Sequence, residues 1–371
     1  MKYPKWNKDR VVYEFNDDIL RVGSDDDDVY DIKGNVKVWK DIIDQFTGKN
    51  SIEDIQNYVY YKYKVDGEKT INFIETFEKN HFLEVLDKPY DEADSFYSYF
   101  ESATTYYSSV GLGGLSLLNR LQKMKITVLG CGAGGSHIAY YLSQCGIGNL
   151  HLVDPDKVDK TNVNRQELFK MTDVGLYKVD TLKKSIEEKN PYINISVSYN
   201  KLSTVADVEK EIIGSNFVVC CMDEPPYIAQ RITNRACFNF GIDSVYCFSQ
   251  KSAGKIFFVS PQKSACSDCL LLKHDSENFQ YLVSKFLNLS SNLVTANIKP
   301  NISLLCSWAS KKIFDYISNS GSVKCNVLYR FDFNKFEEAE FDVFEKNESC
   351  PTCGKYKDNS YTKLWEIIEI N

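Results

Sequence analysis

The feature that most constrains the fold is a glycine-rich turn between an apolar run and an amphipathic run. Residues 126–129 predict a buried strand, and residues 136–145 predict a helix. The turn between them carries four glycines, Gly130, Gly132, Gly134 and Gly135. Glycines let backbone N–H groups approach phosphate oxygens, and the positive end of the following helix adds attraction. The pattern therefore predicts a Rossmann-like, doubly wound α/β sheet with a nucleotide site at the turn.

A second apolar run follows and ends in an acidic residue. Residues 149–153 predict a strand, and Asp154 lies about 20 residues beyond the glycines, where a carboxylate can bond ribose hydroxyls. On these features alone, a nicotinamide or flavin enzyme is an equally good interpretation.

The residues after this strand favour phosphate chemistry over hydride transfer. Asn162, Arg165 and Gln166 follow closely, and a guanidinium can bond phosphate oxygens and neutralise charge that grows in a transition state. Lys178, at the start of a predicted long helix, offers a second cation. Any of these could alone be an ordinary surface residue, but their combination points to phosphoryl transfer.

A further predicted strand places a carboxylate at the same edge of the sheet. Residues 216–221 predict a buried strand, and Met222 and Asp223 follow them. A carboxylate at the carboxyl end of a parallel strand can hold Mg²⁺ against a triphosphate. Asp223 is therefore the candidate magnesium ligand.

Two CxxC pairs predict a structural zinc site. The pairs are Cys266 with Cys269 and Cys350 with Cys353. Four thiolates complete a tetrahedral shell and leave no open position. The alternative is a redox dithiol, which needs a pair at the start of a helix, and we expect neither pair to open one. The other eight of the twelve cysteines are scattered through apolar surroundings, which fits free thiols better than disulfides.

Residues 1–88 have the pattern of a small winged-helix-like domain. Two β-rich runs lie within residues 10–35, and residues 81–86 predict a closing strand. Helical patterns occupy residues 36–46, 51–63 and 69–80. A DNA-reading winged helix is the alternative, but this segment is rich in Asp and Glu, which phosphates repel. The acidic run 25–28 lacks the glycine and distal glutamate of a calcium loop, so it predicts a solvated turn.

Residues 89–120 are polar and rich in tyrosine and predict a helical connector, which leaves residues 121–371 for the nucleotide-binding domain. A net charge of -7 and a pI near 5.4 argue against non-specific binding to nucleic acid. No stretch approaches the roughly 20 apolar residues that span a bilayer, and the start of the chain lacks a signal peptide. We therefore expect a cytoplasmic protein with no membrane partner.

From about Lys125 onward, these motifs resemble in order those of the ThiF/MoeB and ubiquitin-activating superfamily of adenylyltransferases. The resemblance implies catalytic roles for Arg165, Lys178 and Asp223. The full nucleotide set that it implies comprises the four glycines, ribose-binding Asp154, Asp156, phosphate-binding Asn162, Arg165 and Gln166, triphosphate-binding Lys178, and magnesium-binding Asp223. Members of the superfamily also carry paired CxxC motifs in the same places, which supports zinc.

Residues 1–88 are similar in pattern to the recognition domain of enzymes that modify ribosomally made peptides, including a Phe-Leu-Glu ending at residues 82–84. Combined with the adenylation motifs, this is similar to the microcin C adenylyltransferase type. The resemblance implies ATP or CTP, Mg²⁺, a structural zinc, a homodimer and a short ribosomal precursor peptide. In that type the C-terminal carboxylate is activated, a side-chain amide closes a succinimide, and a peptide–nucleotide phosphoramidate results.

The sequence departs from the superfamily at two points. No cysteine lies between Cys269 and Cys306, where relatives place a nucleophile, and residues 97–119 lack the arginine that relatives use across a dimer, which leaves Arg120 as the nearest candidate. Three alternatives remain open. They are cyclisation or dehydration of a peptide, activation of a sulfur-carrier protein, and a scaffold with a vestigial nucleotide fold.

Overall fold

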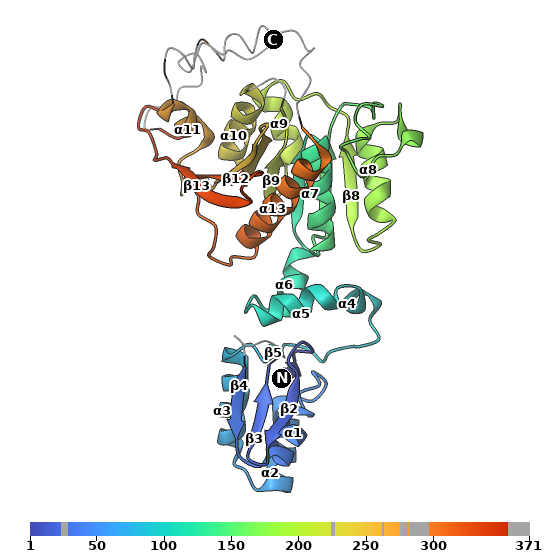
Figure 1. The fold of residues 1–371 in the computed structure, drawn as a ribbon, viewed down its shortest axis with the longest axis vertical. Helices are drawn as coiled ribbons and strands as arrows, with labels where there is room; N and C mark the ends of the chain where they lie inside the picture. Colours follow the sequence, from blue (N-terminus) through green and yellow to red (C-terminus); the bar gives the residue numbers. More distant parts are fainter. Residues whose placement is uncertain are drawn as a thin grey trace. The chain divides into compact units, whose positions relative to one another are not determined.

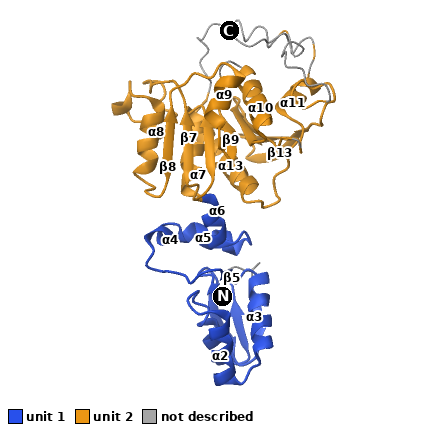
Figure 2. Ribbon diagram, turned by 180° about the vertical axis from the view of Figure 1, so that it is seen from behind, with its two compact units in different colours: residues 1–121 blue, residues 122–371 orange. Residues whose placement is uncertain are grey.

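The chain forms two structural units, residues 1–121 and residues 122–371 (Figure 2). The computed structural model describes residues 1–23, 29–223, 227–261, 263–274, 276, 281 and 297–354. The predicted solvated turn at residues 25–28 lies outside this described part. Among the helices that are described, none combines the length and the apolar character needed to cross a membrane.

The first unit contains the predicted β-rich runs, three helices and closing strand in that order. A three-stranded antiparallel sheet has the order β2-β3-β4, formed by Val12–Asn16, Ile19–Val22 and Tyr30–Lys33. The helices are α1 (Val36–Ile43), α2 (Ile52–Tyr63) and α3 (Gly67–Lys79). β5 (Leu83–Leu86) closes the pattern by pairing antiparallel with β1 (Tyr3–Trp6), a strand that the sequence reading missed.

Local capping and aromatic packing explain why this unit folds as it does. Ser51 caps α2 and forms a capping box with Asp54, which satisfies backbone donors at the helix start. In the core, the Trp6 ring lies 6.3 Å from that of Phe46 and 5.7 Å from that of Phe77, measured between centroids. Such large rings bury much apolar area, so a unit this small gains a substantial core.

The segment after β5 is helical, as predicted, and its last helix is anchored to that strand. It contains α4 (Ser95–Tyr99), α5 (Glu101–Ser109) and α6 (Gly114–Leu121). The Glu84 carboxylate of β5 accepts hydrogen bonds from the backbone N–H groups of Leu115 (3.0 Å) and Ser116 (3.2 Å). A negative charge at a helix N-terminus is favourable. The division of the first unit near residue 88 stays a prediction.

The second unit is built on a mixed sheet, and its parallel part confirms the predicted Rossmann-like core. Its strand order is β13-β12-β11-β10-β9-β6-β7-β8. Five strands run parallel: β6 (Lys125–Leu129), β7 (Asn149–Val153), β8 (Asn194–Ser198), β9 (Phe217–Cys220) and β10 (Asp243–Ser249). Three follow in antiparallel pairing: β11 (Ala253–Val259), β12 (Val327–Asp332) and β13 (Glu337–Val343).

Helices cover both faces of this sheet (Figure 1). One face carries α7 (Ala133–Gln144), α8 (Lys178–Glu187) and α13 (Lys299–Ile317). The other carries α9 (Val205–Ile212), α10 (Ile228–Phe240) and α11 (Ser267–Lys273). Because β6 leads through α7 to β7 on one side while β9 lies on its other side, the chain reverses its winding direction between β6 and β9. Open α/β sheets bind ligands at such a switch point.

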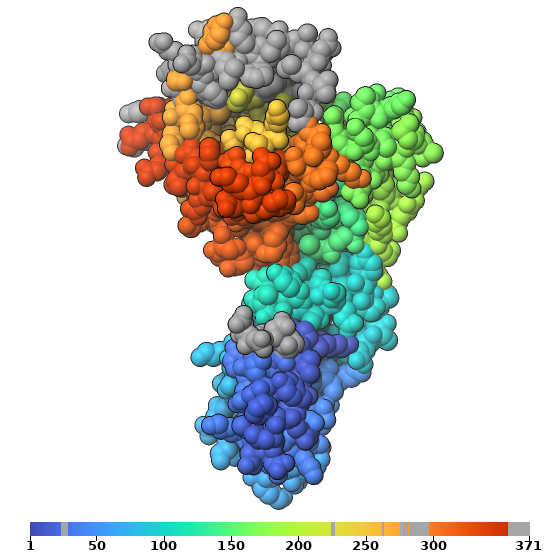
Figure 3. Space-filling model, in the orientation of Figure 1, coloured from blue at the N-terminus to red at the C-terminus, as the bar shows by residue number. Residues whose placement is uncertain are grey.

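The antiparallel extension ends in an exposed edge strand. Side chains of β13 and of the turn before it lie at the surface of the second unit, where the red residues gather in Figure 3. Phe341 is 54% exposed, and the cationic groups of Lys255 and Arg330 lie 4.8 and 5.8 Å from the centroid of its ring. β13 itself carries exposed acidic side chains, Glu338 and Glu340 among them, and charges on an edge strand discourage pairing with another strand.

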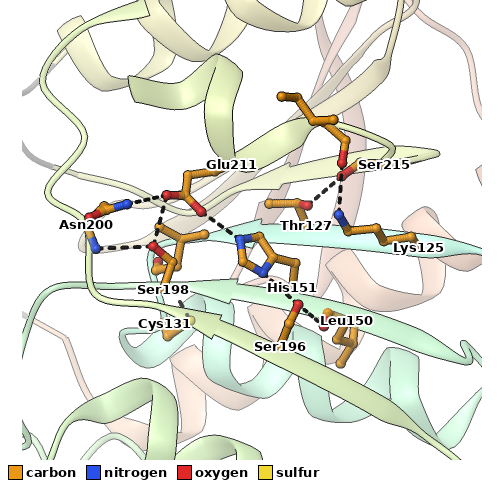
Figure 4. A network of polar contacts seen from close by, with 12 residues as sticks. Lys125, Thr127, Cys131, Leu150, His151, Ser196, Ser198, Asn200, Glu211 and Ser215 are labelled. Atoms are coloured by element: carbon orange, nitrogen blue, oxygen red, sulfur yellow. Dashed lines mark hydrogen bonds and ion pairs between the residues drawn. The ribbon is translucent and has the colours of Figure 1, made fainter. Parts of the chain in front are cut away.

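A polar network ties β7 and β8 to helix α9. His151 lies between two partners, with Nδ1 2.8 Å from Ser196 Oγ and Nε2 2.7 Å from a carboxylate oxygen of Glu211 (Figure 4). The other Glu211 oxygen accepts hydrogen bonds from Ser198 (2.9 Å) and Asn200 (2.6 Å). Burial acts to raise the pKa of Glu211, but these hydrogen bonds outweigh it and hold the pKa below its ordinary value.

We predict that Glu211→Gln destabilises the protein by about 1–3 kcal/mol near neutral pH, because an amide replaces one acceptor oxygen of this buried carboxylate with a donor. The contribution of ionised Glu211 to the free energy of unfolding is complete above the ordinary glutamate pKa of about 4.3. It is lost as the pH falls through the lower pKa that this group has in the folded state. The difference in the free energy of unfolding between wild type and variant should therefore shrink in acid. Chemical unfolding at several pH values measures it, with Glu188→Gln at the exposed C-cap of α8 as the control. A difference that is constant with pH would contradict this reading.

Candidate functional site

The glycine turn lies where β6, β9 and α7 approach one another most closely. Gly130 has a φ of +85°, and a Cβ there would lie 2.9 Å from the carbonyl oxygen of Cys221. A Cβ on Gly135 would lie 1.9 Å from the carbonyl oxygen of Gly130. Both positions therefore require glycine, because any side chain would push the helix away from the strand.

The other two glycines face open space. A Cβ on Gly132 would meet nothing within 4 Å, and one on Gly134 would meet only the Cys221 side chain, with Sγ at 3.8 Å. Gly132 is also the N-cap of α7 and offers no side-chain cap. The helix start thus leaves backbone donors directed at an open region, which is the arrangement that binds phosphate.

Asp154 holds the turn from the end of β7. Its carboxylate accepts hydrogen bonds from the backbone N–H of Cys131 (2.7 Å) and of Asp156 (2.8 Å). Burial raises the pKa of Asp154, and the nearby Lys178 opposes that shift. Because each carboxylate oxygen can accept more than one hydrogen bond, the predicted contact with a ribose is compatible with this arrangement.

The predicted cation Lys178 lies at the first position of α8, next to this carboxylate. Its side chain is only 9% exposed, and its Nζ lies 2.7 Å from a carboxylate oxygen of Asp156, which is 63% exposed. A buried ammonium needs a paired anion. The ion pair with Asp156 therefore orients Lys178 at the carboxyl edge of the sheet.

The remaining predicted residues lie in loops at this edge. Arg165 and Gln166 belong to a series of turns after β7, with their backbone N–H groups bonded to the Asn162 carbonyl at 3.0 and 2.8 Å. No hydrogen bond or ion pair joins the Arg165 guanidinium to another residue of the described part of the chain. Asp223 is exposed and follows β9 by three residues. The roles assigned to these residues stay predictions.

One polar residue of this region was missed by the sequence reading. His137 on α7 is 2% exposed, and its Nδ1 lies 2.7 Å from the Ala133 carbonyl oxygen, to which it must donate. Its Nε2 has no hydrogen-bond partner within the described residues and lies 3.7 Å from a carboxylate oxygen of Glu167. A single histidine inside an amphipathic helix carries no spacing signal, so only the structure reveals it.

The four predicted zinc ligands converge. The sulfur of Cys266 lies 3.5 Å from that of Cys350, and the sulfurs of Cys269 and Cys353 are 3.3 Å apart. All four sulfurs lie within 4.8 Å of one another and are buried. A tetrahedral site with Zn–S bonds of about 2.3 Å places sulfurs about 3.8 Å apart, so this set fits zinc.

Buried ion pairs and hydrogen bonds support the cysteine cluster. Arg231 on α10 pairs with the buried Asp268 (3.1 Å), which also accepts a hydrogen bond from Thr352 (2.6 Å). Backbone N–H groups of Asn347 and Cys353 donate to two of the sulfurs, at 3.4 and 3.5 Å. Such outer contacts orient metal ligands and stabilise thiolates.

One expectation about these cysteines is wrong. Cys266 is the N-cap of α11 and Cys269 lies within it, so the first pair does open a helix. The short sequence 267–273 was too brief to give a helical signal. A redox dithiol nevertheless fits less well than a metal site, because a second pair of thiols completes the cluster.

We predict opposite outcomes for two alanine variants of the turn. Gly135→Ala should destabilise the protein by about 1–3 kcal/mol or more, because its Cβ would collide with the Gly130 carbonyl. Gly132→Ala should leave stability unchanged but weaken nucleotide binding, since its methyl group enters the open region. Thermal unfolding and ATP titration measure both effects. Equal melting temperatures for the two variants would refute this assignment.

We also predict one zinc ion per chain, detectable by elemental analysis. Cys353→Ser should release it and lower the unfolding temperature, because structural zinc contributes folding free energy directly. Cys325→Ser is the matched control, since Cys325 is a half-buried cysteine outside the cluster. Zinc-free protein of unchanged stability would rule the metal site out.

Comparison with known proteins places this geometry in a family. Residues 106–352 match the ThiF family. The crystal structure of E. coli MccB with ATP is similar over 95% of this chain and 100% of that one, with a TM-score of 0.69 and 19% identity. The same coverage and TM-score hold for MccB, described as a microcin C7 biosynthetic enzyme, in complex with N-formylated MccA. At this identity the likeness shows a common fold.

Curated relatives match mainly the second unit. Ubiquitin-like modifier-activating enzyme 5 of Aedes aegypti is 26% identical over 257 residues, which are 65% of this chain and 61% of that protein. The adenylyltransferase and sulfurtransferase UBA4 of Lodderomyces elongisporus is 29% identical over 158 residues, 42% of this chain and 34% of that protein. The chain thus spans less than two thirds of these relatives. Because the family match itself covers well over half of the 371 residues, together with the glycine turn and the cysteine cluster, the chain belongs to the ThiF family.

Proposed function

We propose that this protein is an adenylyltransferase that activates the C-terminal carboxylate of a short ribosomal precursor peptide. The observation that carries the proposal is the meeting of three elements at the β6/β9 switch point. They are an open glycine turn, a buried lysine held by a carboxylate, and an exposed aspartate after β9. Backbone N–H groups and a lysine bind phosphates, and a carboxylate binds Mg²⁺. A nucleotide site needs these groups in one place.

In the proposed reaction a peptide carboxylate oxygen attacks the α-phosphorus of ATP. A bond forms between that oxygen and phosphorus, the bond to the β-phosphate oxygen breaks, and pyrophosphate leaves with the electron pair. The role of Arg165 and Lys178 is to neutralise charge on the departing phosphates. Asp223 would hold Mg²⁺, which would supply further positive charge to the phosphates.

The electrostatics of the site support a division of labour between the two cations. Lys178 is buried and already paired with Asp156, so its position is fixed before the nucleotide arrives. Arg165 lies on a loop, half-buried, without an ion-pair partner among the described residues. A guanidinium in that state can form two parallel hydrogen bonds to a phosphate. We infer that Lys178 forms part of a rigid cradle and that Arg165 closes onto the bound nucleotide.

The first unit offers an edge that suits an extended peptide. β2 pairs only with β3, so its other edge keeps free backbone groups within the described sheet. Val11, Tyr13 and Phe15 share one side of this run and are 52%, 40% and 52% exposed. Peptides add to such edges through main-chain hydrogen bonds, with apolar side chains giving selectivity. We propose that this β2 edge holds the precursor peptide.

The complexes of MccB with ATP and with MccA support a nucleotide and a peptide as partners here. By the same likeness we propose that the protein is a homodimer and that ATP or CTP serves as the nucleotide. A succinimide and then a peptide–nucleotide phosphoramidate would follow activation. Cyclisation or dehydration within the peptide is the alternative outcome.

A second candidate function is activation of a sulfur-carrier or ubiquitin-like protein. The relatives named above favour it. Against it, the chain lacks a cysteine between Cys269 and Cys306 that could accept an acyl group. ATP–pyrophosphate exchange separates the two functions, because it will depend either on a short peptide or on a carrier protein that ends in Gly-Gly.

We predict that Arg165→Ala and Asp223→Ala each reduce ATP–pyrophosphate exchange by about 100- to 1,000-fold, the usual cost of losing one preorganised charge. Both side chains lie outside the core, so the unfolding temperature should not change. Lys170→Ala, which removes an exposed cation from the same stretch of chain, is the control and should exchange normally. Near-normal exchange by either site variant would disprove its assigned role.

We predict that the double variant Tyr13→Ser with Phe15→Ser raises the KM for the peptide at least tenfold, which corresponds to about 1.4 kcal/mol of lost binding. Affinity for ATP should stay the same. The matched control is Tyr60→Ser with Tyr61→Ser, which removes two exposed tyrosines from α2, 53% and 73% exposed. If both double variants process the peptide with unchanged KM, the β2 edge is not the peptide site.

A further inference from the structure

Two cysteines lie side by side under the glycine turn, one directly after β9 and the other on β10. The parallel register of β9 and β10 pairs Cys220 with Tyr246, so the next residues, Cys221 and Cys247, are opposite each other. The backbone N–H of Cys221 still bonds to the Leu129 carbonyl of β6 at 2.9 Å, which keeps Cys221 in line with the sheet. Neighbouring strands are about 4.8 Å apart, which lies within the Cα separation that a disulfide can bridge.

The side chains of this pair point to the face that carries α7 and α13. The preceding Cys220 contacts Thr233 of α10 on the opposite face, and side chains alternate along a strand. Cys221 Sγ lies beside Gly134, 3.8 Å from where its Cβ would be. Cys306 of α13 donates to the carbonyl oxygens of Ala133 and Gly134, at 3.8 and 3.7 Å (Figure 1 shows the two helices together).

The three thiols differ in accessibility. Cys306 is fully buried, whereas Cys221 and Cys247 are half-buried. A small oxidant therefore has better access to the strand pair than to the helix thiol. None of these three thiols belongs to the zinc cluster, which among the described residues consists of the two CxxC pairs.

We propose that Cys221 and Cys247 form a reversible disulfide that switches off nucleotide binding. The oxidant is a peroxide. One thiolate attacks the peroxide and breaks its O–O bond, which gives a sulfenic acid and hydroxide. The second thiol then attacks that sulfur, an S–S bond forms, and water leaves. Two thiols and one hydrogen peroxide thus yield one disulfide and two waters.

The effect on the site follows from the position of Cys221. A disulfide would draw this residue toward β10 and away from Gly134 and the Gly130 turn that its backbone contacts. Asp223, the proposed magnesium ligand, follows only two residues later. A misplacement of about 1 Å near a reacting centre can cost about 100-fold in rate. This inference rests on the proposed nucleotide site.

The test uses the full-length protein, reduced and then treated with hydrogen peroxide. Free thiols are blocked with an alkylating reagent, and tryptic peptides are analysed by mass spectrometry. The expected product is a link between peptide 211–231 and peptide 236–251, two hydrogens lighter than their sum, with the fragment ions assigning it to Cys221 and Cys247. Dithiothreitol should remove the link, and prior addition of ATP with Mg²⁺ should slow its formation.

Pyrophosphate exchange by the same samples gives the second readout. Oxidised wild type should lose about 100-fold in rate and recover on reduction. Cys247→Ser should resist oxidation while exchanging normally when reduced, and Cys247→Ala provides a second variant if the serine disturbs folding. Cys145→Ser, which removes a half-buried cysteine at the end of α7, should respond to peroxide like wild type. Retention of zinc in the oxidised sample excludes damage to the metal cluster.

The outcomes are distinguishable. Failure of peroxide to link the two peptides overturns the cysteine pair, whatever the enzyme does. A linked protein that exchanges as fast as the reduced one overturns the switch but leaves the proposed function intact. If reduced wild type neither binds ATP nor exchanges pyrophosphate, the proposed function fails, and the switch on nucleotide binding is overturned with it.

Discussion

The rest of the structure depends on the close approach of the Gly130 carbonyl to the backbone of Gly135. The Gly130 carbonyl oxygen lies 1.9 Å from where a Cβ on Gly135 would be. This contact therefore allows no side chain, and it sets α7 directly against β6. The same turn lies against the Cys221–Met222 backbone after β9, so it also fixes the switch point between the two halves of the sheet. Asp154 then fastens the turn from the β7 side. The site is open because all of this packing occurs beneath it and leaves Gly132 uncovered.

The sequence predicts those parts of the fold whose cause is local. The glycine turn, the strand at Asn149–Val153 and the capped helix after Ser51 depend on neighbouring residues, and all three are present. The zinc cluster was predictable for a different reason, because four thiolates have few alternatives to one metal. Pairing of β1 with β5 joins residues 77 to 83 positions apart and has no local signature, so it was missed.

The candidate site was predicted in outline rather than in detail. Spacing placed Lys178 and Asp223 at the carboxyl edge, but it could not show that Asp156 pairs with the lysine or that Arg165 has no such partner. The buried His137 and the network of His151 with Glu211 were also invisible, since their partners come from segments far apart in sequence or from the backbone. Buried polar groups need partners, yet a sequence does not name them.

The cysteine cluster has a consequence for chain topology. Cys266 and Cys350 are 84 positions apart, so a metal bound to them closes a loop that contains α13 and the β12–β13 hairpin. By the estimate used for cross-links, closing a loop of this length removes unfolded-chain entropy equivalent to about 4.5 kcal/mol. A bound metal would thus retain the last described residues by coordination, in addition to their packing. Arg231 of α10 is bonded to Asp268 inside this closure, so the closed loop would also restrain the helix that begins five residues after Asp223. It would thereby limit how far the strand end at the nucleotide site can move.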